Sequence, residues 1–276
     1  MRYFRILGAI ALGLLIVACR KDHVASPNPL PTAPAKKVLL KDIIIPNLPS
    51  PYYHFEYNQD SMVAKVGFAA GYNAYDVIYK GNSIAEMRNN IAVNHDTLRY
   101  LYDNAGKVFM ITFINQANVL YRHVAFAYNG DQVKEIDWDH KVGDVGFQID
   151  RSLTFTYYPD GNVKTVAELR RADDGSTTNS TWQIEQYDDK INVDDFDLVH
   201  DGIHDHLFLF QGFRLQKNNP GREIFTQAAG QPAYTVDFGY TYNRDNTPAA
   251  KTGNLLYTDG PDAGKKFQTN TAYTYY

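Results

Sequence analysis

The chain has 276 residues, of which 27 are Lys or Arg and 31 are Asp or Glu, giving a net charge of −4. The basic residues are scattered, whereas phosphate binding needs them concentrated, so we expect no nucleic-acid partner. The single cysteine excludes an internal disulfide, so the fold must be stabilised by the burial of a core.

The first segment, residues 1–18, has the organisation of an export signal. Two arginines precede the apolar run 6–17, which is shorter than the about 20 residues that a membrane-spanning helix needs. The sequence Leu-Ile-Val-Ala-Cys at 15–19 matches a bacterial lipobox. We therefore predict a lipoprotein signal peptide and a membrane-anchoring lipid on Cys19; a free or buried thiol is the alternative.

The next segment is rich in proline, because seven of the twelve prolines lie between Pro27 and Pro51. This composition predicts an extended, semi-rigid spacer. We assign residues 19–51 to the lipid anchor and its tether, and residues 52–276 to a single domain.

The domain is organised by a sequence repeat. An aromatic or aliphatic residue, any residue and then Tyr precede a turn rich in Asn, Asp and Gly; an apolar residue follows, and a second one comes three positions later. This spacing predicts one β-hairpin with its connection for each copy. Degenerate copies surround Tyr187 and Tyr242. The five regular copies carry Tyr57, Tyr79, Tyr102, Tyr128 and Tyr157.

The turn residues and the strand period add detail to these hairpins. We expect Gly106 and Gly161 in left-handed turn positions, and positive φ angles at Asn129-Gly130. The aromatic residue and the Tyr of each copy are two apart, so their rings should line one face of the sheet. Apolar residues three apart would face opposite sides of a regular strand, so the pattern predicts either a repeated β-bulge or a sheet covered on both faces.

One segment departs from the β pattern. Phe196, Val199, Ile203, Leu207 and Phe210 recur at helical spacing, which predicts one helix inserted at 194–213. The predicted fold is mainly β, an antiparallel meander of hairpins forming a large twisted or curved sheet. The C-terminal segment 272–276 is also typical of an outer-membrane barrel, but the lipid anchor and the lack of long alternating strands argue against one.

Two resemblances follow from these motifs. The Tyr-Asp-x-x-Gly-x-Val element from Tyr102 to Val108 resembles the YD hairpin repeats of RHS-type shell proteins. The lipobox, the hairpins and the segments 187–192, 217–220 and 240–242 resemble a lipoprotein domain of Bacteroidota over most of residues 52–276. This resemblance implies repeated hairpins and transfers no activity or site. With the lipobox, it implies an outer-membrane protein, lipid-anchored on the periplasmic side or at the cell surface.

The predicted helix carries one cluster with metal-ligand spacing. Asp197, His200, Asp201 and His204 lie at i, i+3 and i+4 positions on one flank, where imidazoles and carboxylates can converge on zinc. Neither an HExxH motif nor a distant partner accompanies them, so the alternative is a solvated helix border. We predict no metal and no cofactor.

A second candidate lies on an expected strand, where Asp137 and Asp139 flank Trp138. An indole with adjacent carboxylates is a candidate contact for a sugar, although alternating acids also occur on exposed strands. The sequence has no Gly-rich phosphate loop and no Gly-x-Ser-x-Gly element.

These observations favour a non-catalytic, lipid-anchored envelope protein whose aromatic sheet binds a glycan, a peptide or an envelope partner. A carrier of an apolar ligand is the first alternative and requires a continuous apolar cavity. A metal-dependent or carboxylate hydrolase is the second, and it requires acids or histidines that converge in one cleft.

Overall fold

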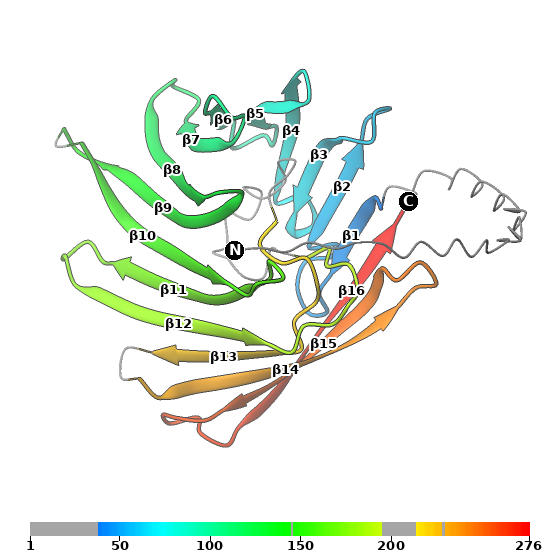
Figure 1. The fold of residues 1–276 in the computed structure, drawn as a ribbon. Coiled ribbons are helices and arrows are strands. Elements are labelled where there is room, and N and C mark those ends of the chain that lie inside the picture. Colours follow the sequence, from blue (N-terminus) through cyan, green and yellow to red (C-terminus); the bar gives the residue numbers. More distant parts are fainter. Residues whose placement is uncertain (1–37, 145, 195–213, 228–229) are drawn as a thin grey trace, which may run out of the picture. The chain divides into compact units, whose positions relative to one another are not determined.

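The structure is a computed structural model that describes residues 38–144, 146–194, 214–227 and 230–276. Within these ranges, sixteen antiparallel strands follow one another in sequence order around a closed barrel (Figure 1). The strands are β1 Leu40–Ile44, β2 Tyr53–Tyr57, β3 Val63–Phe68, β4 Asn73–Lys80, β5 Ser83–Asn89, β6 Thr97–Tyr102, β7 Val108–Ile114, β8 Leu120–Asn129, β9 Gln132–Val142, β10 Gly146–Tyr157, β11 Val163–Arg171, β12 Thr177–Glu185, β13 Arg222–Gln227, β14 Pro232–Tyr242, β15 Pro248–Tyr257 and β16 Lys266–Tyr275.

The meander predicted from the sequence is confirmed, but the sheet closes on itself instead of remaining an open curved sheet. Closure depends on β1, which pairs with β2 on one side and with β16 on the other. Asp42 of β1 ties the three strands together, because its carboxylate contacts His54 Nδ1 at 2.6 Å and accepts a hydrogen bond from Thr274 Oγ1 at 2.7 Å. Although partial burial raises the pKa of Asp42, these hydrogen bonds hold it below its usual value.

The barrel begins before residue 52, inside the segment assigned to the tether. Strand β1 lies in an apolar run between the prolines, and its Leu40 and Ile43 are buried in the core. Because prolines lie on both sides of this run, its composition predicts a spacer, and the strand that closes the sheet was missed.

The helix predicted at 194–213 falls outside the described residues from 195 onward. Asp194 itself lies outside helix and strand. Among the described residues, the helical segment is one 3-10 turn, η1 at Ala69–Gly71. In these same parts of the chain, no helix is long and apolar enough to cross a membrane.

The repeated β-bulge is confirmed. In the first hairpin, Glu56 pairs with Lys65 but Tyr57 pairs with Val63, so Ala64 is an extra residue in its strand. The same register shift occurs beside each of the other regular repeat tyrosines. An extra residue turns two apolar side chains that are three apart toward the same side. The second and third copies show this arrangement, because both apolar residues of each copy are buried. Ile84, Met87, Val108 and Ile111 are all at most 2% exposed.

The repeat tyrosines connect each hairpin to the next. Tyr57 donates its hydroxyl to the Leu40 carbonyl of β1 at 2.8 Å. The later tyrosines, with Tyr187 of a degenerate copy, donate to the carbonyl of the first apolar residue after the preceding turn, at 2.7 to 2.8 Å: Tyr79 to Val63, Tyr102 to Ile84, Tyr128 to Val108, Tyr157 to Val133 and Tyr187 to Val163.

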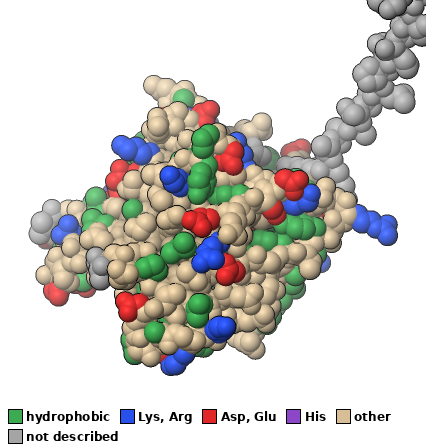
Figure 2. Space-filling model, turned by 60° about the horizontal axis from the view of Figure 1, so that its bottom comes forward, with side chains coloured by type: hydrophobic (Ala, Val, Ile, Leu, Met, Phe, Trp, Pro, Cys, Tyr) green, Lys and Arg blue, Asp and Glu red, His purple; other side chains and the backbone are tan. Residues whose placement is uncertain are grey.

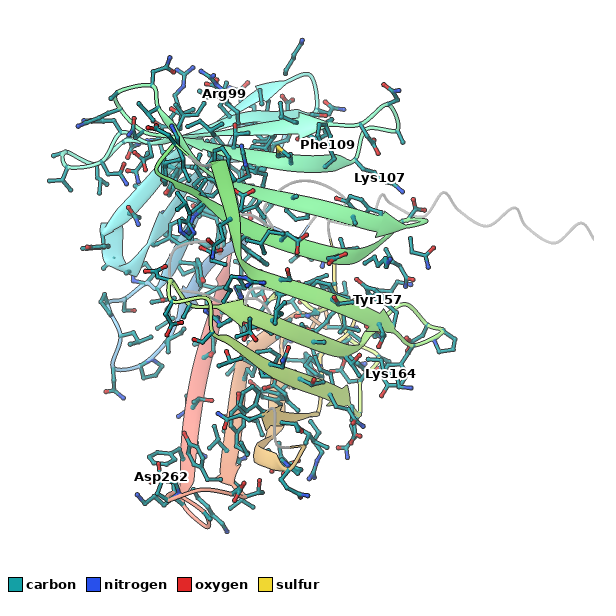
Figure 3. All side chains as sticks on the ribbon, turned by 90° about the vertical axis from the view of Figure 1, so that its left-hand side faces the viewer. Arg99, Lys107, Phe109, Tyr157, Lys164 and Asp262 are labelled. Atoms are coloured by element: carbon teal, nitrogen blue, oxygen red, sulfur yellow. The ribbon has the colours of Figure 1, made fainter. Side chains whose placement is uncertain are left out.

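These carbonyls lie where pairing between neighbouring hairpins has ended. The β3–β4 ladder, for example, stops at Lys65 and Asp76, so Val63 has no partner on β4. The hydroxyl of Tyr79 therefore satisfies a backbone group that the ladder leaves open. Burial raises the pKa of Tyr79 and Tyr102 to about 12, which keeps both phenols protonated as donors. We call this end of the barrel the tyrosine end; in Figure 3 it is the side on which Lys107, Tyr157 and Lys164 are labelled.

The connection between β12 and β13 contributes to the interior. Its Leu215 is fully buried in the hydrophobic core. Asp188 and Asn219 join the two described arms of this connection, since the Asn219 backbone N–H donates to the Asp188 carboxylate at 3.1 Å. Tyr242 of β14 also donates its hydroxyl to Asp188. The three sequence segments that carried the resemblance to a lipoprotein domain thus meet at the tyrosine end.

The outward-facing side chains are frequently charged and paired across strands. Glu86 of β5 contacts Arg88 at 2.7 Å and Arg99 of β6 at 3.1 Å, and Arg222 of β13 contacts Asp237 of β14 at 3.2 Å. On the face shown in Figure 2, acidic, basic and hydrophobic side chains are interspersed. The described strands therefore place most of their large apolar residues inside the barrel, and several ion pairs on its outer surface.

The turn glycines give the first prediction. Gly106 and Gly161 have φ angles of 80° and 90°, as expected; Gly130 has a φ of 57°, whereas Asn129, where a positive φ was also expected, has none. An added Cβ at Gly106 meets no atom within 4 Å, so backbone strain is the main cost of a side chain there. Gly106→Val should lower the free energy of unfolding by about 1 to 2 kcal/mol. Gly239→Val is the control, because Gly239 has an ordinary strand φ and equal space. Equal denaturation midpoints for both variants would contradict the turn assignment.

The tyrosine ladder gives the second prediction. Tyr128→Phe removes the donor to the Val108 carbonyl and leaves that partly buried group unsatisfied. We expect a loss of about 1 to 2 kcal/mol in the free energy of unfolding, measured by urea titration. Tyr72→Phe is the matched control, because Tyr72 is 78% exposed. A loss of the same size in the control would show that the hydroxyl–carbonyl bond is not the cause.

Candidate binding site

Five aromatic side chains form a continuous row across the last five strands. Centroid distances between successive rings are 4.9 Å (Trp182 to Phe225), 4.6 Å (Phe225 to Tyr234), 6.1 Å (Tyr234 to Tyr257) and 5.8 Å (Tyr257 to Phe267). Their strand positions place them toward the end of the barrel opposite the tyrosine end. We call these five residues the aromatic row.

The aromatic row is partly exposed, unlike the buried aromatic residues of the repeats. Trp182 packs against the core but remains partly exposed, and Phe267 is 54% exposed. By contrast, Phe55 and Phe155 of the repeats are at most 4% exposed. The repeat rings therefore line one face, as predicted, but that face is the core and offers no binding surface.

The Tyr234 ring stacks on the Phe225 ring, with an angle of 20° between the ring planes. Burial, and then the negative charge of Glu223, raises the pKa of Tyr234 to about 12. The Tyr234 hydroxyl is therefore neutral at physiological pH and can act as a donor and an acceptor.

Charged side chains of β10 and β11 lie next to the Trp182 end of the row. Glu168 of β11 accepts from Arg151 Nε at 2.7 Å, contacts Arg170 Nε at 3.0 Å and accepts from Ser180 Oγ at 3.2 Å. Ser180 precedes Trp182 by two residues on the same strand face. The row thus borders a carboxylate that two guanidinium groups neutralise.

The structure separates the three residues predicted as a sugar contact. Trp138 is 2% exposed, and the Arg151 guanidinium lies 4.7 Å from its ring centroid inside the barrel. Asp137 and Asp139 face the other side, as strand alternation requires. Asp137 accepts from Ser152 Oγ at 2.5 Å, and Asp139 accepts from the His123 backbone N–H at 2.8 Å. These side chains do not form one platform.

The other predicted site residues lie outside the described residues: Cys19 and the candidate metal ligands Asp197, His200, Asp201 and His204. Across residues 38–144, 146–194, 214–227 and 230–276, no group of three or more His, Cys, Asp or Glu side chains could hold a metal ion.

Sequence reasoning missed the aromatic row because each member lies on a different strand. Phe225 and Tyr234 are nine residues apart, and Trp182 precedes Phe225 by 43 residues. The register of five strands is needed to bring them together. The sequence offered one weak indication of the row, because aromatic residues remain frequent after residue 180, where the regular repeat has ended.

Comparison with solved structures shows a shared fold. A porin-like protein from Bacteroides uniformis ATCC 8492 matches with a TM-score of 0.58 and 15% identity, over 87% of this chain and 95% of that one. A porin-like protein from Bacteroides vulgatus ATCC 8482 matches with a TM-score of 0.59 and 14% identity, over 86% of this chain and 99% of that one. No family model matches the chain, and no curated protein shows significant similarity.

The two tryptophans of the chain give a direct test of this site's accessibility. With Trp138→Phe, the remaining Trp182 should be quenched by acrylamide severalfold more strongly than Trp138 in the Trp182→Phe variant, because Trp138 is 2% exposed. Steady-state and lifetime quenching measure this difference. Equal quenching in the two variants would contradict the assignment of Trp182 to an accessible row.

Proposed function

We propose that this chain is a non-catalytic, lipid-anchored protein of the cell envelope. In this proposal, the rigid barrel presents aromatic side chains for binding a glycan, a peptide or another envelope component. The lipobox ending at Cys19 and the fold shared with porin-like proteins of Bacteroides support the envelope location. The accessible aromatic row is the observation that carries the binding role.

The surface pattern favours a lipid as the means of attachment. Membrane-spanning barrels carry an outward apolar band and a polar interior. The described strands instead carry ion pairs on the outside, at Glu86 and Arg222, beside exposed apolar side chains such as Phe109 and Ile149, and they bury Ile111, Ile136 and Leu153 in the interior. Charged groups on a lipid-facing surface would cost several kcal/mol at mid-depth. A lipid on Cys19 would attach the barrel without exposing this surface to the bilayer core.

The pattern of burial favours binding at the end of the barrel over transport of an apolar ligand inside it. Between the tyrosine turns and the aromatic row, the inward-facing side chains pack as one core that includes Trp138 and Leu215. A carrier of an apolar ligand needs an enclosed apolar space of several hundred Å³. The aromatic row, in contrast, needs no internal space to make contact with a ligand.

The anchor is tested by removing its attachment point. Cys19→Ala should abolish incorporation of a radiolabelled fatty acid, and the protein should accumulate as unprocessed precursor, because the cysteine thiol is the site of lipid addition. Gel autoradiography and fractionation of outer membranes measure both effects. Ala18→Gly, which keeps a small residue before the cysteine, is the control and should remain labelled. Equal label on Cys19→Ala would overturn the anchored location.

A further inference from the structure

We infer that the aromatic row is a binding track for a linear, largely neutral oligosaccharide. The inference deepens the proposed function, on which it rests, by naming the ligand class. It depends on three features: the continuity of the rings, the polar groups beside them and the closed form of the barrel.

The continuity of the row favours an extended ligand. Its rings follow one another at 4.6 to 6.1 Å, close to the strand spacing of about 4.8 Å, because each strand contributes one ring. A single small ring would cover only one or two members, such as Phe225 and Tyr234. A chain of sugar rings lying across the strands can contact all five.

The groups beside the row match the two kinds of surface that a sugar presents. Aromatic faces receive the apolar C–H face of a pyranose, while its hydroxyl edge needs hydrogen-bonding partners. The phenol groups of Tyr234 and Tyr257 lie in the row and can bond to this edge, while the nearby Glu168 carboxylate is 7% exposed and already engaged. Arg151 and Arg170 neutralise Glu168, which favours a ligand without strong charge.

The closed barrel argues against the two other classes of ligand. An extended peptide commonly adds to a free sheet edge, but here β1 and β16 pair with each other, so the sheet has no free edge. A lipid chain would bring the Arg170 side chain, which is 43% exposed, beside its hydrocarbon, at a desolvation cost.

Local hydrogen bonds hold the row in place before binding. Thr258, in the turn after β15, donates its backbone N–H to the Ala233 carbonyl at 2.9 Å and its hydroxyl to the Pro232 carbonyl at 2.5 Å. These bonds tie the hairpin that carries Tyr257 and Phe267 to the start of the strand that carries Tyr234; Asp262 marks the tip of this hairpin in Figure 3. A preordered row loses little conformational entropy on binding.

The test is calorimetric titration of the full chain, purified from membranes in detergent, with cellohexaose, maltohexaose, xylohexaose and chitohexaose and with the corresponding disaccharides. We expect at least one hexasaccharide to bind, and its disaccharide to bind about tenfold more weakly or worse, because it covers fewer rings. Trp182→Ala should weaken binding about tenfold or more, the usual scale for truncating an aromatic anchor.

Two further variants keep the test independent of folding. Phe267→Ala changes a ring that is 54% exposed at the edge of the row, so it should weaken hexasaccharide binding severalfold with an unchanged melting temperature. Phe109→Ala is the matched control, because Phe109 is 41% exposed on β7, outside the row (Figure 3). The control should bind as the unchanged chain does.

Three results would overturn the inference: no hexasaccharide binds, the disaccharides bind as tightly as the hexasaccharides, or Trp182→Ala and Phe267→Ala both leave affinity unchanged. Each of these results is separate from the fatty-acid label on Cys19. A labelled protein that binds no sugar would retain the envelope location and lose the glycan track. An unlabelled protein that binds through Trp182 would do the reverse.

Discussion

The hydrogen bond from a repeat tyrosine to a backbone carbonyl is the interaction on which the barrel depends. Consecutive hairpins stop pairing before their turns, and each stop leaves a carbonyl such as that of Val63 without a ladder partner. The hydroxyl of the next tyrosine fills this position, and the bulge beside the tyrosine turns both neighbouring apolar residues inward. One short motif therefore satisfies the backbone, aligns the hairpins and supplies the core.

Closure of the barrel removes the two edge strands that a meander of hairpins would otherwise have. A meander of hairpins has two edge strands, and exposed edges are sites for aggregation. The short strand β1 pairs with both neighbours and removes these edges, with Asp42 held between His54 and Thr274. The interior holds the apolar core with a few buried ion pairs such as Arg151 with Glu168, while pairs such as Glu86 with Arg99 lie on the outer surface.

The fold could be predicted from the sequence wherever it is determined locally. The hairpins, the bulges and the left-handed glycines Gly106 and Gly161 each depend on residues within one repeat. Closure and the aromatic row could not be predicted, because they depend on the register of strands far apart in sequence. Leu40 meets Tyr275, for example, and Trp182 meets Phe225. The inward direction of Trp138 follows from which face of its strand is buried, and alternation alone does not say which face that is.

The position of the aromatic row relative to the repeats is itself informative. The regular motif extends from β2 to β11, where aromatic rings are buried and tyrosine hydroxyls are engaged by the backbone. From β12 onward the motif degenerates, and there the rings stay partly exposed beside Glu168 and its two arginines. If stability were the only requirement, the regular motif could continue through these strands as well. Local departures from such consistency are expected where residues are retained for binding, because exposed aromatic surface adds little to the core. The break in the repeat and the partly exposed rings therefore occur on the same five strands, β12 to β16.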